Sequence, residues 1–420
     1  MAHTNWAGNL TYSAASVVAP ATVAEAQEIV RATPKVRPLG TRHCFNAIAD
    51  TDAVQLSLEH QRNIVSLDKA KRQVVIEGGM RYGDLTPELH AAGFALHNLA
   101  SLPHISVAGA IATATHGSGV TLRGLGAAVA AIEFIDARGD LVTLSRDKDG
   151  DTFAGAVVHL GCLGVVTRIT LDLEPTFDIR QDIFVDLPIE AAVANFDAIM
   201  SAGYSVSWFT DWNGSVIEQV WVKSRVAPGE SFTPRADVFG AKPASRKMHP
   251  VSRLDPIHCT EQMGEAGAGY DKLPHFRMGF TPASGEEIQV EYFVAQEYAV
   301  DVVKLLARFG SRLSPLLMIS EVRMVAADDF WMSPFCKRPS TAFHFSFHKD
   351  WTALSRLLPE LEAALAPFHP LPHWGKQFTI PAATIQSRYP RLGDFRALAA
   401  KHDPAGKFRN AFVEKYLLGA

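Results

Sequence analysis

Two groups of residues in this sequence could do chemistry, and the first lies in residues 98–119, NLASLPHISVAGAIATATHGSG. The stretch is rich in small residues, which let a ligand lie against the backbone, and it contains no carboxylate, lysine or arginine. Backbone N–H groups in consecutive turns form concave anion sites, and hydroxyls such as Ser101, Ser106 and Thr113 add neutral donors. We therefore expect a loop here that binds a dinucleotide diphosphate.

A second loop of this kind is PLGTRHCFN, residues 38–46. Gly40 and Thr41 follow a predicted strand and offer free amides to a phosphate. A lone histidine in such a turn is usually structural, but a second small-residue loop in the chain favours a functional role for His43. No G-x-G-x-x-G motif follows a predicted strand, which argues against a Rossmann nucleotide site.

The second group consists of polar side chains on predicted strands. Glu321 and Arg323 are two residues apart, so both point to one face of a strand. In residues 343–348, FHFSFH, three phenylalanines share one face, while His344, Ser346 and His348 share the other. The pattern alone is more typical of an amphipathic sheet with one solvated face. A lysine such as Lys376 in the short loop HWGK is likewise usually solvated.

The elements that must position these residues fall into two sets. The first 175 residues mix helices and strands and predict an α+β domain. We expect helices at 20–33 (with a Thr22/Glu25 capping box) and 82–92, and strands at 36–39, 55–58, 64–68, 73–78, 130–136, 140–145 and 163–173.

After Glu174-Pro175 a second α+β domain with an antiparallel sheet is predicted. We expect strands at 179–186, 206–212, 216–222, 287–295, 318–324 and 342–348, helices at 188–201, 296–309 and 354–366, and an irregular excursion at 225–273. The predicted domains are thus 1–175 and 176–370, with 371–420 returning to the first.

Composition narrows the class of protein. The chain has 420 residues, 47% of them hydrophobic and 20% charged, and its net charge of −4 gives no case for binding nucleic acid or an anionic membrane. The four cysteines form no CxxC pair, so neither a disulfide framework nor a metal site is predicted, and a cytoplasmic location fits. The N-terminus lacks the features of a signal peptide, and we expect no membrane span.

Several motifs, in order, resemble those of a known family. PLGTRHCFN, SLPHISVAGAIATATHGSG and GCLGVVTRITL resemble the FAD-binding (PCMH-type) domain of the vanillyl-alcohol-oxidase family. HWGKQF and HDPAGKFRNAF resemble C-terminal motifs of sugar and aldonolactone oxidases. Within this family the chain looks most similar to the alditol oxidases, which act on xylitol or sorbitol.

The resemblance implies FAD, attached covalently at His43, a bond expected to raise the flavin redox potential. It also implies a set of residues that wrap or contact the cofactor. These are Pro38, Leu39, Gly40, Thr41, Arg42, His43, Cys44, Ser101, Ser106, Gly109, Thr113, Ala114, Thr115, His116 and Val166.

The resemblance also implies a substrate site. Glu321, Arg323, His344 and Ser346 match positions that contact a polyol, with Ser346 where the family often has threonine. Lys376 would lie by flavin and substrate, where a cation stabilises the anionic reduced ring. Ser101 would touch both flavin and reacting oxygen, and small Ala100 would leave O2 a path to the flavin.

The implied reaction is oxidation of a terminal hydroxyl of xylitol, sorbitol or glycerol to the aldehyde, with O2 reduced to H2O2. The proton acceptor stays open between Glu321, His344 and neutral Lys376. The alternatives are an aldonolactone oxidase or dehydrogenase on the same scaffold, or a non-catalytic carbohydrate- or flavin-binding protein. We expect a monomer.

Overall fold

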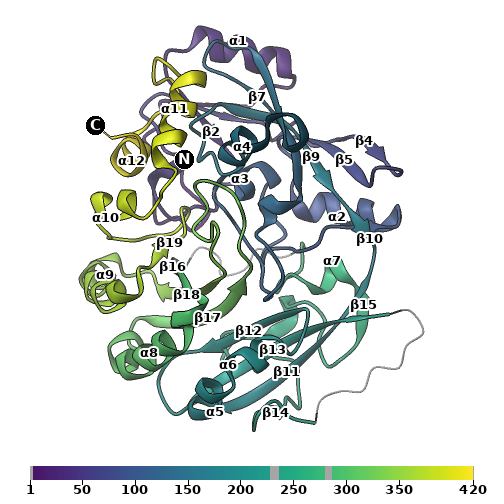
Figure 1. Cartoon of the computed structure of the whole chain (residues 1–420), viewed down its shortest axis with the longest axis vertical. Helices are drawn as coiled ribbons and strands as arrows, with labels where there is room; N and C mark the ends of the chain where they lie inside the picture. Colours follow the sequence, from purple (N-terminus) through teal and green to yellow (C-terminus); the bar gives the residue numbers. More distant parts are fainter. Residues whose placement is uncertain (1–2, 228–235, 280–285, 420) are drawn as a thin grey trace.

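The structure, a computed structural model, describes residues 3–227, 236–279 and 286–419 and consists of two lobes stacked along its longest axis (Figure 1). The upper lobe is formed by the N-terminal part of the chain together with its C-terminal helices. The lower lobe is formed by the middle of the chain around one large sheet. The two lobes share one continuous hydrophobic core, which includes Val107 above and Phe343 below.

The upper lobe contains three sheets. The hairpin β7–β8 turns at Gly139, whose φ of 82° suits glycine, and the Asp136 carboxylate accepts hydrogen bonds from the turn amides of Arg138 and Asp140. A parallel sheet has the order β1-β3-β2, an antiparallel sheet the order β4-β5-β9-β7-β8, and β6 pairs with β10. The strands are β1 (Ser16–Val18), β2 (Val36–Leu39), β3 (Val54–Ser57), β4 (Ile64–Asp68), β5 (Gln73–Glu77), β6 (Phe94–Ala95), β7 (Val129–Ile135), β8 (Leu141–Ser145), β9 (Val165–Asp172) and β10 (Glu174–Pro175).

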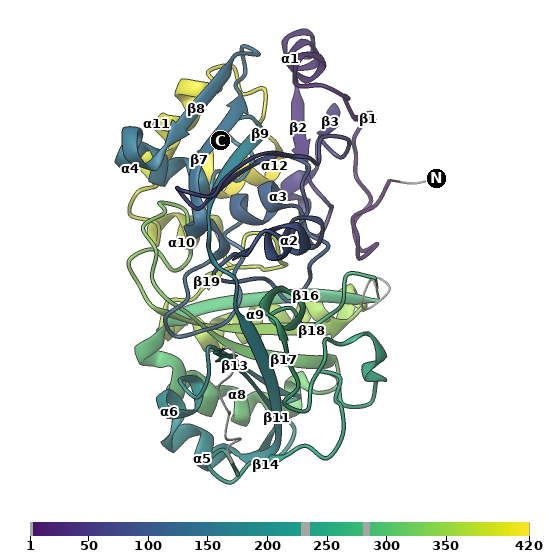
Figure 2. The same ribbon diagram turned by 90° about the vertical axis from the view of Figure 1, so that its right-hand side faces the viewer.

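The lower lobe is built on a nine-stranded antiparallel sheet of order β14-β11-β13-β12-β17-β18-β16-β19, with β15 pairing beside β11. Phe343, Phe345 and Phe347 of β18 are fully buried in the main core with Leu306 of α8 and Leu358 of α9. Helices α5, α6 and α8 lie on the side away from the upper lobe (Figure 2). The strands are β11 (Asp178–Pro188), β12 (Ser205–Thr210), β13 (Val216–Val226), β14 (Lys242–Pro243), β15 (Ala266–Ala268), β16 (Glu287–Ala295), β17 (Leu317–Val325), β18 (Ser340–His348) and β19 (Leu371–Pro372).

The helices are mostly short, apart from the two that cover the lower sheet. The α-helices are α1 (Val23–Ala32), α2 (Tyr82–Ala91), α3 (Val107–Ala112), α4 (Arg146–Val157), α5 (Ile189–Ala194), α6 (Phe196–Met200), α7 (Gly269–Lys272), α8 (Ala299–Leu313), α9 (Trp351–Leu365), α10 (Ala382–Ser387), α11 (Leu392–His402) and α12 (Ala411–Val413). Single turns of tighter or wider helix are η1 (Ala47–Ala49), η2 (Leu125–Ala128), η3 (Pro256–His258), η5 (Gln296–Tyr298), η6 (Ala366–Phe368) and η7 (Glu414–Leu418).

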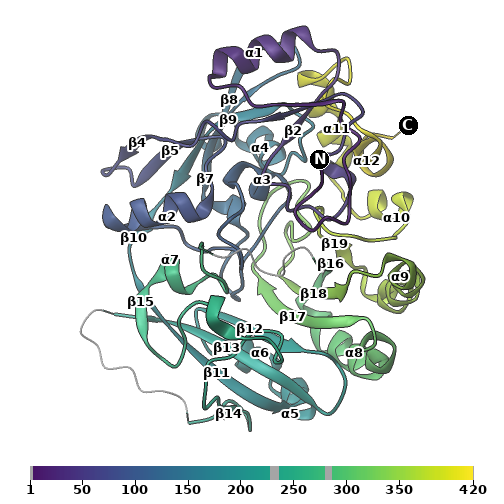
Figure 3. The same ribbon diagram turned by 180° about the vertical axis from the view of Figure 1, so that it is seen from behind.

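The C-terminal segment contacts both lobes. Its strand β19 pairs with β16 of the lower sheet, and helices α11 and α12 then lie beside the upper lobe (Figure 3). There Lys407 O accepts a hydrogen bond from Val36 N at 3.0 Å, and Phe408 is buried in a small core with Ala26 and Val30. This segment therefore carries residues of the loop after β19 to the seam between the lobes.

Most predicted strands are confirmed, several to the residue. Of the Thr22/Glu25 capping box, the bond from Glu25 N to Thr22 Oγ1 is present, while the Glu25 carboxylate accepts from Ala21 N and not from Thr22 N. Two predictions of local structure are wrong. The stretch 98–119, expected to be a loop, contains α3, and the helix expected at 188–201 breaks at Asn195, whose φ of −127° is not helical. In addition, no helix is predicted where α4 forms. The excursion 225–273 holds the short elements β14, η3, β15 and α7, and its residues 228–235 lie outside the described part.

Among the residues that the structure describes, no helix is both long and apolar enough to cross a membrane.

Candidate active site

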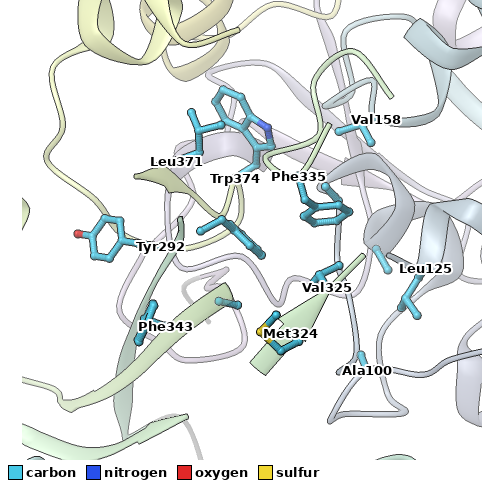
Figure 4. Close-up of a cluster of buried hydrophobic side chains, with 14 of the residues drawn as sticks. Ala100, Leu125, Val158, Tyr292, Met324, Val325, Phe335, Phe343, Leu371 and Trp374 are labelled. Atoms are coloured by element: carbon cyan, nitrogen blue, oxygen red, sulfur yellow. The ribbon is translucent and has the colours of Figure 1, made fainter. Parts of the chain in front are cut away.

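A cavity of about 600 Å³ lies between the two lobes. Its upper wall comes from the turn after β2, the loop before α3 and the start of β9. Its lower wall comes from β16, β17 and β18 and from the loop after β19. The lobes are also joined by apolar packing, in which Trp374 and Leu371 of the C-terminal segment lie in one buried cluster with Phe335, Val325 and Val158 (Figure 4).

The upper wall contains a cradle in which two loops meet. Thr41 Oγ1 accepts a hydrogen bond from Ser106 N at 3.1 Å, which ties the turn after β2 to the start of α3. A Cβ added to Gly40 or to Gly109 would lie only 2.8 Å from Ser106 Oγ, so both positions need glycine for this close approach. The Ser106 hydroxyl is buried and has no hydrogen-bond partner in the protein. A buried hydroxyl without a partner fits a site completed by a polar ligand such as a dinucleotide.

His43 lies on the same wall with a fixed ring. Its Nδ1 lies 3.1 Å from Thr41 Oγ1, and its ring stacks on Trp6 with centroids 5.2 Å apart. Burial, and then the nearby His104 and Lys376, lower the pKa of His43 to about 3, so the imidazole is neutral at physiological pH. A neutral imidazole has a free lone pair and can act as a nucleophile.

The predicted cofactor residues line this cavity with one exception. Ala114 is buried with φ 56°, and its side chain is not part of the wall, although its neighbours Thr113 and Thr115 are. The members that line it are Pro38, Leu39, Gly40, Thr41, Arg42, His43, Cys44, Ser101, Ser106, Gly109, Thr113, Thr115, His116 and Val166.

The six residues predicted to handle the substrate also line this cavity. Glu321 and His344 are directly paired in the register of β17 and β18, and Arg323 and Ser346 point to the same side two residues along. Lys376 follows β19, and Ser101 faces them from the upper lobe, with its Oγ 3.5 Å from Arg323 Nη1. The polar face expected from the alternation is therefore buried between the lobes, not solvated.

Arg323 lies between two buried carboxylates. Its Nη2 donates to Glu291 Oε1 at 2.6 Å, and its Nε lies 3.6 Å from Glu321 Oε2. His116 Nε2 lies 3.1 Å from the same oxygen of Glu291, and His275 Nε2 lies 2.8 Å from Glu321 Oε1. The guanidinium is thus held from both sides, and each oxygen of Glu321 faces a different partner, Oε1 facing His275 and Oε2 facing Arg323.

Burial and charge set the ionisation of these groups. Burial raises the pKa of Glu321, but Arg323 and then His275 lower it more, so the net pKa is well below its usual range. Glu291 behaves in the same way under Arg323 and His116. Burial lowers the pKa of His344 to about 3, so that ring is neutral, and its Nδ1 is buried without a hydrogen-bond partner.

Lys376 is held by the neighbouring strand β16. Its Nζ donates to Gln289 Oε1, and it lies over the Phe45 ring, 4.9 Å from the centroid. Gln289 Nε2 in turn donates to Glu287 Oε1 at 2.5 Å. Burial lowers the pKa of Lys376, although Glu291 and Glu287 act in the opposite direction.

The sequence reasoning missed these residues of β16. Glu287, Gln289 and Glu291 are spaced two apart in a strand that was itself predicted, so their side chains share one face. That spacing is the same signal that selects Glu321 and Arg323. His275 and Lys223 carried no comparable signal in the sequence. Lys223 contacts His275, and His275 contacts Glu321, only because the chain after β13 folds back onto the sheet.

Comparisons with known proteins identify the family models and relatives that this chain matches. Residues 14–145 match the family model described as FAD binding domain, and residues 287–416 match that of D-arabinono-1,4-lactone oxidase. The chain is 44% identical over 419 residues, 99% of both chains, to the alditol oxidase of Streptomyces sp. (strain IKD472 / FERM P-14339). It is 25% identical to the L-gulono-1,4-lactone dehydrogenase of Mycobacterium tuberculosis (strain ATCC 25618 / H37Rv), over 98% of each.

Among solved structures, a solvent-stable cholesterol oxidase superposes with a TM-score of 0.79 at 14% identity, covering 99% of this chain and 97% of that one. This likeness confirms the predicted two-domain, PCMH-type α+β fold. The cradle fits FAD, and the high identity along the whole length identifies the relatives. The chain belongs to the alditol oxidase family of FAD-dependent oxidoreductases.

Proposed function

We propose that this protein oxidises a terminal hydroxyl of an alditol to the aldehyde and transfers the two electrons and two protons to O2, which forms H2O2. The observation that carries the proposal is the meeting of Glu321, Arg323 and Lys376 with Ser101 across one buried cavity. Charged groups on otherwise apolar strands, with shifted pKa values, are typical of catalytic sites. The 44% identity to an alditol oxidase supports the substrate class.

FAD, when bound along the upper wall, supplies the acceptor for a hydride and the donor of electrons to O2. The polyol is held from below. Glu321 lines the cavity, and its Oε2, 3.6 Å from Arg323 Nε, accepts hydrogen bonds from the hydroxyls next to the reacting carbon. Arg323 and Lys376 lower the effective pKa of the reacting hydroxyl by favouring a developing alkoxide. Ser101 Oγ positions the reacting oxygen from above.

We assign the proton acceptor to His344. Its ring lines the cavity and is neutral at physiological pH, so one of its two nitrogens is unprotonated. Glu321 is a weaker choice, because its carboxylate already accepts from His275 and is paired with Arg323. Lys376 is held by its donation to Gln289 and remains available to stabilise negative charge.

The test is the visible spectrum of the purified protein with xylitol, first without air and then with air. Bleaching followed by recovery, with one H2O2 formed per aldehyde, is expected. The competing lactone activity, suggested by the match of residues 287–416, predicts bleaching by gulonolactone and not by xylitol, sorbitol or glycerol. No bleaching by any of them would favour a non-catalytic binding protein.

We further propose that His43 carries the covalent bond to FAD. The neutral, fixed ring beside the cradle supports this assignment. After acid precipitation the yellow colour should stay in the wild-type pellet and move to the supernatant for His43→Ala. His104→Ala is the matched control, because His104 also lines the cavity but its Nε2 lies 2.7 Å from Met278 O. A colourless wild-type pellet would refute the bond.

Two broader properties are proposed with it. A reducing cytoplasm suits the four cysteines, all of which are unpaired thiols in the structure. We also propose a monomer, which size-exclusion chromatography of the purified protein tests.

A further inference from the structure

Lys223 is a buried lysine that none of the catalytic roles above uses. It lies on β13, only 1% exposed, in the sheet of the lower lobe. Its ammonium faces three acceptors, namely Leu273 O at 2.6 Å, Pro274 O at 3.2 Å and His275 Nδ1 at 3.1 Å. An ammonium group has three N–H donors and no acceptor, so these contacts use all of them.

The contact with Lys223 decides which nitrogen of His275 carries the proton. Burial lowers the pKa of Lys223 to about 7, and below that pH the ammonium can only donate. Nδ1 of His275 must then accept, so the single proton of the neutral ring is on Nε2. Burial lowers the pKa of His275 to about 4, so the ring is neutral. The rings of Phe209 and Trp221 pack edge-on against it, with centroids 5.5 and 5.2 Å away, and fix its plane.

The Nε2–H of His275 points at the carboxylate of Glu321. It lies 2.8 Å from Glu321 Oε1, which leaves the other oxygen, Oε2, beside Arg323 Nε at 3.6 Å on the wall of the cavity. The same residue also ties the lower lobe to the opposite wall, because its backbone N–H donates to Ser101 O at 3.0 Å. Lys223, His275 and Glu321 thus form one chain of hydrogen bonds that ends at the polyol site.

We propose that Lys223 is a positioning residue, which fixes the tautomer of His275 and through it aims the carboxylate of Glu321 at the substrate. This inference rests on the proposed function for its substrate, but the chain of contacts does not depend on which polyol or lactone is bound. Without the ammonium, the Nδ1–H tautomer of His275 becomes accessible, and its bare Nε2 would face the carboxylate. Glu321 would then turn away from its present orientation.

A double-mutant cycle tests this role. Lys223→Met should raise KM for xylitol roughly tenfold, the worth of about one hydrogen bond to a charged group, and change kcat much less. Lys223→Arg should restore most of the affinity. His275→Gln offers Glu321 an amide donor that has no tautomer, so in this background Lys223→Met should change KM less than twofold. Gln181→Met is the matched control, a fully buried polar residue paired with Lys223 across β11 and β13 and not on the cavity wall.

The ring nitrogens report the tautomer without any substrate. ¹⁵N-histidine spectra are recorded near pH 6, between the pKa values of His275 and Lys223. The His275 signals, identified by their loss in His275→Gln, should show an unprotonated Nδ1 in the wild type and in Lys223→Arg. A protonated Nδ1 in the wild type would overturn the proposal. An undiminished effect of Lys223→Met in the His275→Gln background would also overturn it, because Lys223 would then act only by clamping residues 273–274.

The two proposals fail in different ways. If wild-type protein reacts with a lactone and not with xylitol, the proposed oxidation of alditols is refuted. The double-mutant cycle of Lys223 and His275, measured with that lactone, then still tests the role of Lys223. If Lys223→Met does not fold, the Lys223→Arg variant and the wild-type ¹⁵N spectrum still decide the tautomer.

Discussion

Glu291 offers a direct measure of how the buried charges hold the site. Its side chain is almost fully buried, and it accepts a hydrogen bond from Arg323 Nη2 at 2.6 Å. Glu291→Gln keeps the shape and removes the charge. Arg323 would then be neutralised only by Glu321, whose Oε2 lies 3.6 Å from Arg323 Nε.

The expected loss is large because a buried charge loses a partner. Removing one member of a buried ion pair costs about 3–5 kcal/mol, and the glutamine oxygen can still accept one hydrogen bond, so we expect about 3 kcal/mol. At about 2.1 cal/mol/K per residue, the unfolding entropy of the 420 residues is about 0.9 kcal/mol/K, so the melting midpoint at pH 7.5 should fall by roughly 3–4 °C.

The pH dependence follows from the pKa of Glu291. Burial raises this pKa, but Arg323 and His116 together lower it by more, so the net pKa lies well below the value of 4.5 for an ordinary glutamate. The stabilisation is therefore complete above the unfolded pKa and is lost as the pH falls through the folded one. The difference between wild type and Glu291→Gln should thus shrink as the pH is lowered well below 4.5.

Thermal melts followed by circular dichroism at both ends of this pH range provide the assay. Glu360→Gln is the control, since Glu360 is about half exposed in a surface pair with Arg312 and should shift the midpoint by no more than about 1 °C. A fall of less than about 1 °C for Glu291→Gln, or a fall that does not depend on pH, would refute the reasoning.

Three further outcomes follow from the same geometry. Gly109→Val should fill the cradle at Ser106 Oγ and reduce bound flavin at least tenfold by the 450/280 nm absorbance ratio, whereas Gly393→Val, in open space, should not; full flavin content in the first would contradict the cradle. Glu321→Gln should raise KM for xylitol by about 10–100-fold through the loss of a charged acceptor, and an unchanged KM would remove Glu321 from the substrate site. Burial lowers the pKa of Lys223 from 10.5 to about 7, so unfolding takes up a proton between these pH values. The free energy of unfolding of the wild type should therefore gain up to about 3–5 kcal/mol from this group as the pH rises from about 7 to 10.5. Lys223→Met should lack that gain, and an equal dependence on pH in denaturant titrations of the two proteins would disprove it.

Strong periodicity made the strands and the longer helices predictable, whereas several short helices had weak or mixed sequence patterns and were not predicted. The alternation in β16–β18 fixed both the strands and their buried faces. In α4 the interior Gly150 has a φ of 46°, and charged residues fill the first turn, so no apolar stripe marks a helix. In the lower lobe, the expected helix breaks at Asn195, whose side-chain amide donates a hydrogen bond to Ala191 O.

The residues of the substrate face could be predicted from the sequence one by one, but the hydrogen bonds and ion pairs that hold them could not. Alternation places Glu321 and Arg323 on one face of a strand, and the family motifs select them. Whether that face is solvated or buried depends on the upper lobe, which packs over it. The partners Glu291 and His275 depend on register and on the excursion, and no local pattern encodes a contact between residues 46 positions apart.

The charge balance of the site argues for an uncharged substrate. The buried carboxylates of Glu287, Glu291 and Glu321 are offset by Arg323, Lys376 and the ammonium of Lys223. Burial keeps His275, His344 and His373 neutral. A polyol enters this balanced set without adding a charge, and its hydroxyls can both donate to Glu321 and accept from Lys376. A substrate bearing a carboxylate would bring an unpaired charge into a buried site, where desolvation is costly. The same balance leaves Arg323 and Lys376 as the nearest positive charges when an alkoxide develops, so the negative charge that forms during the reaction meets a field already in place.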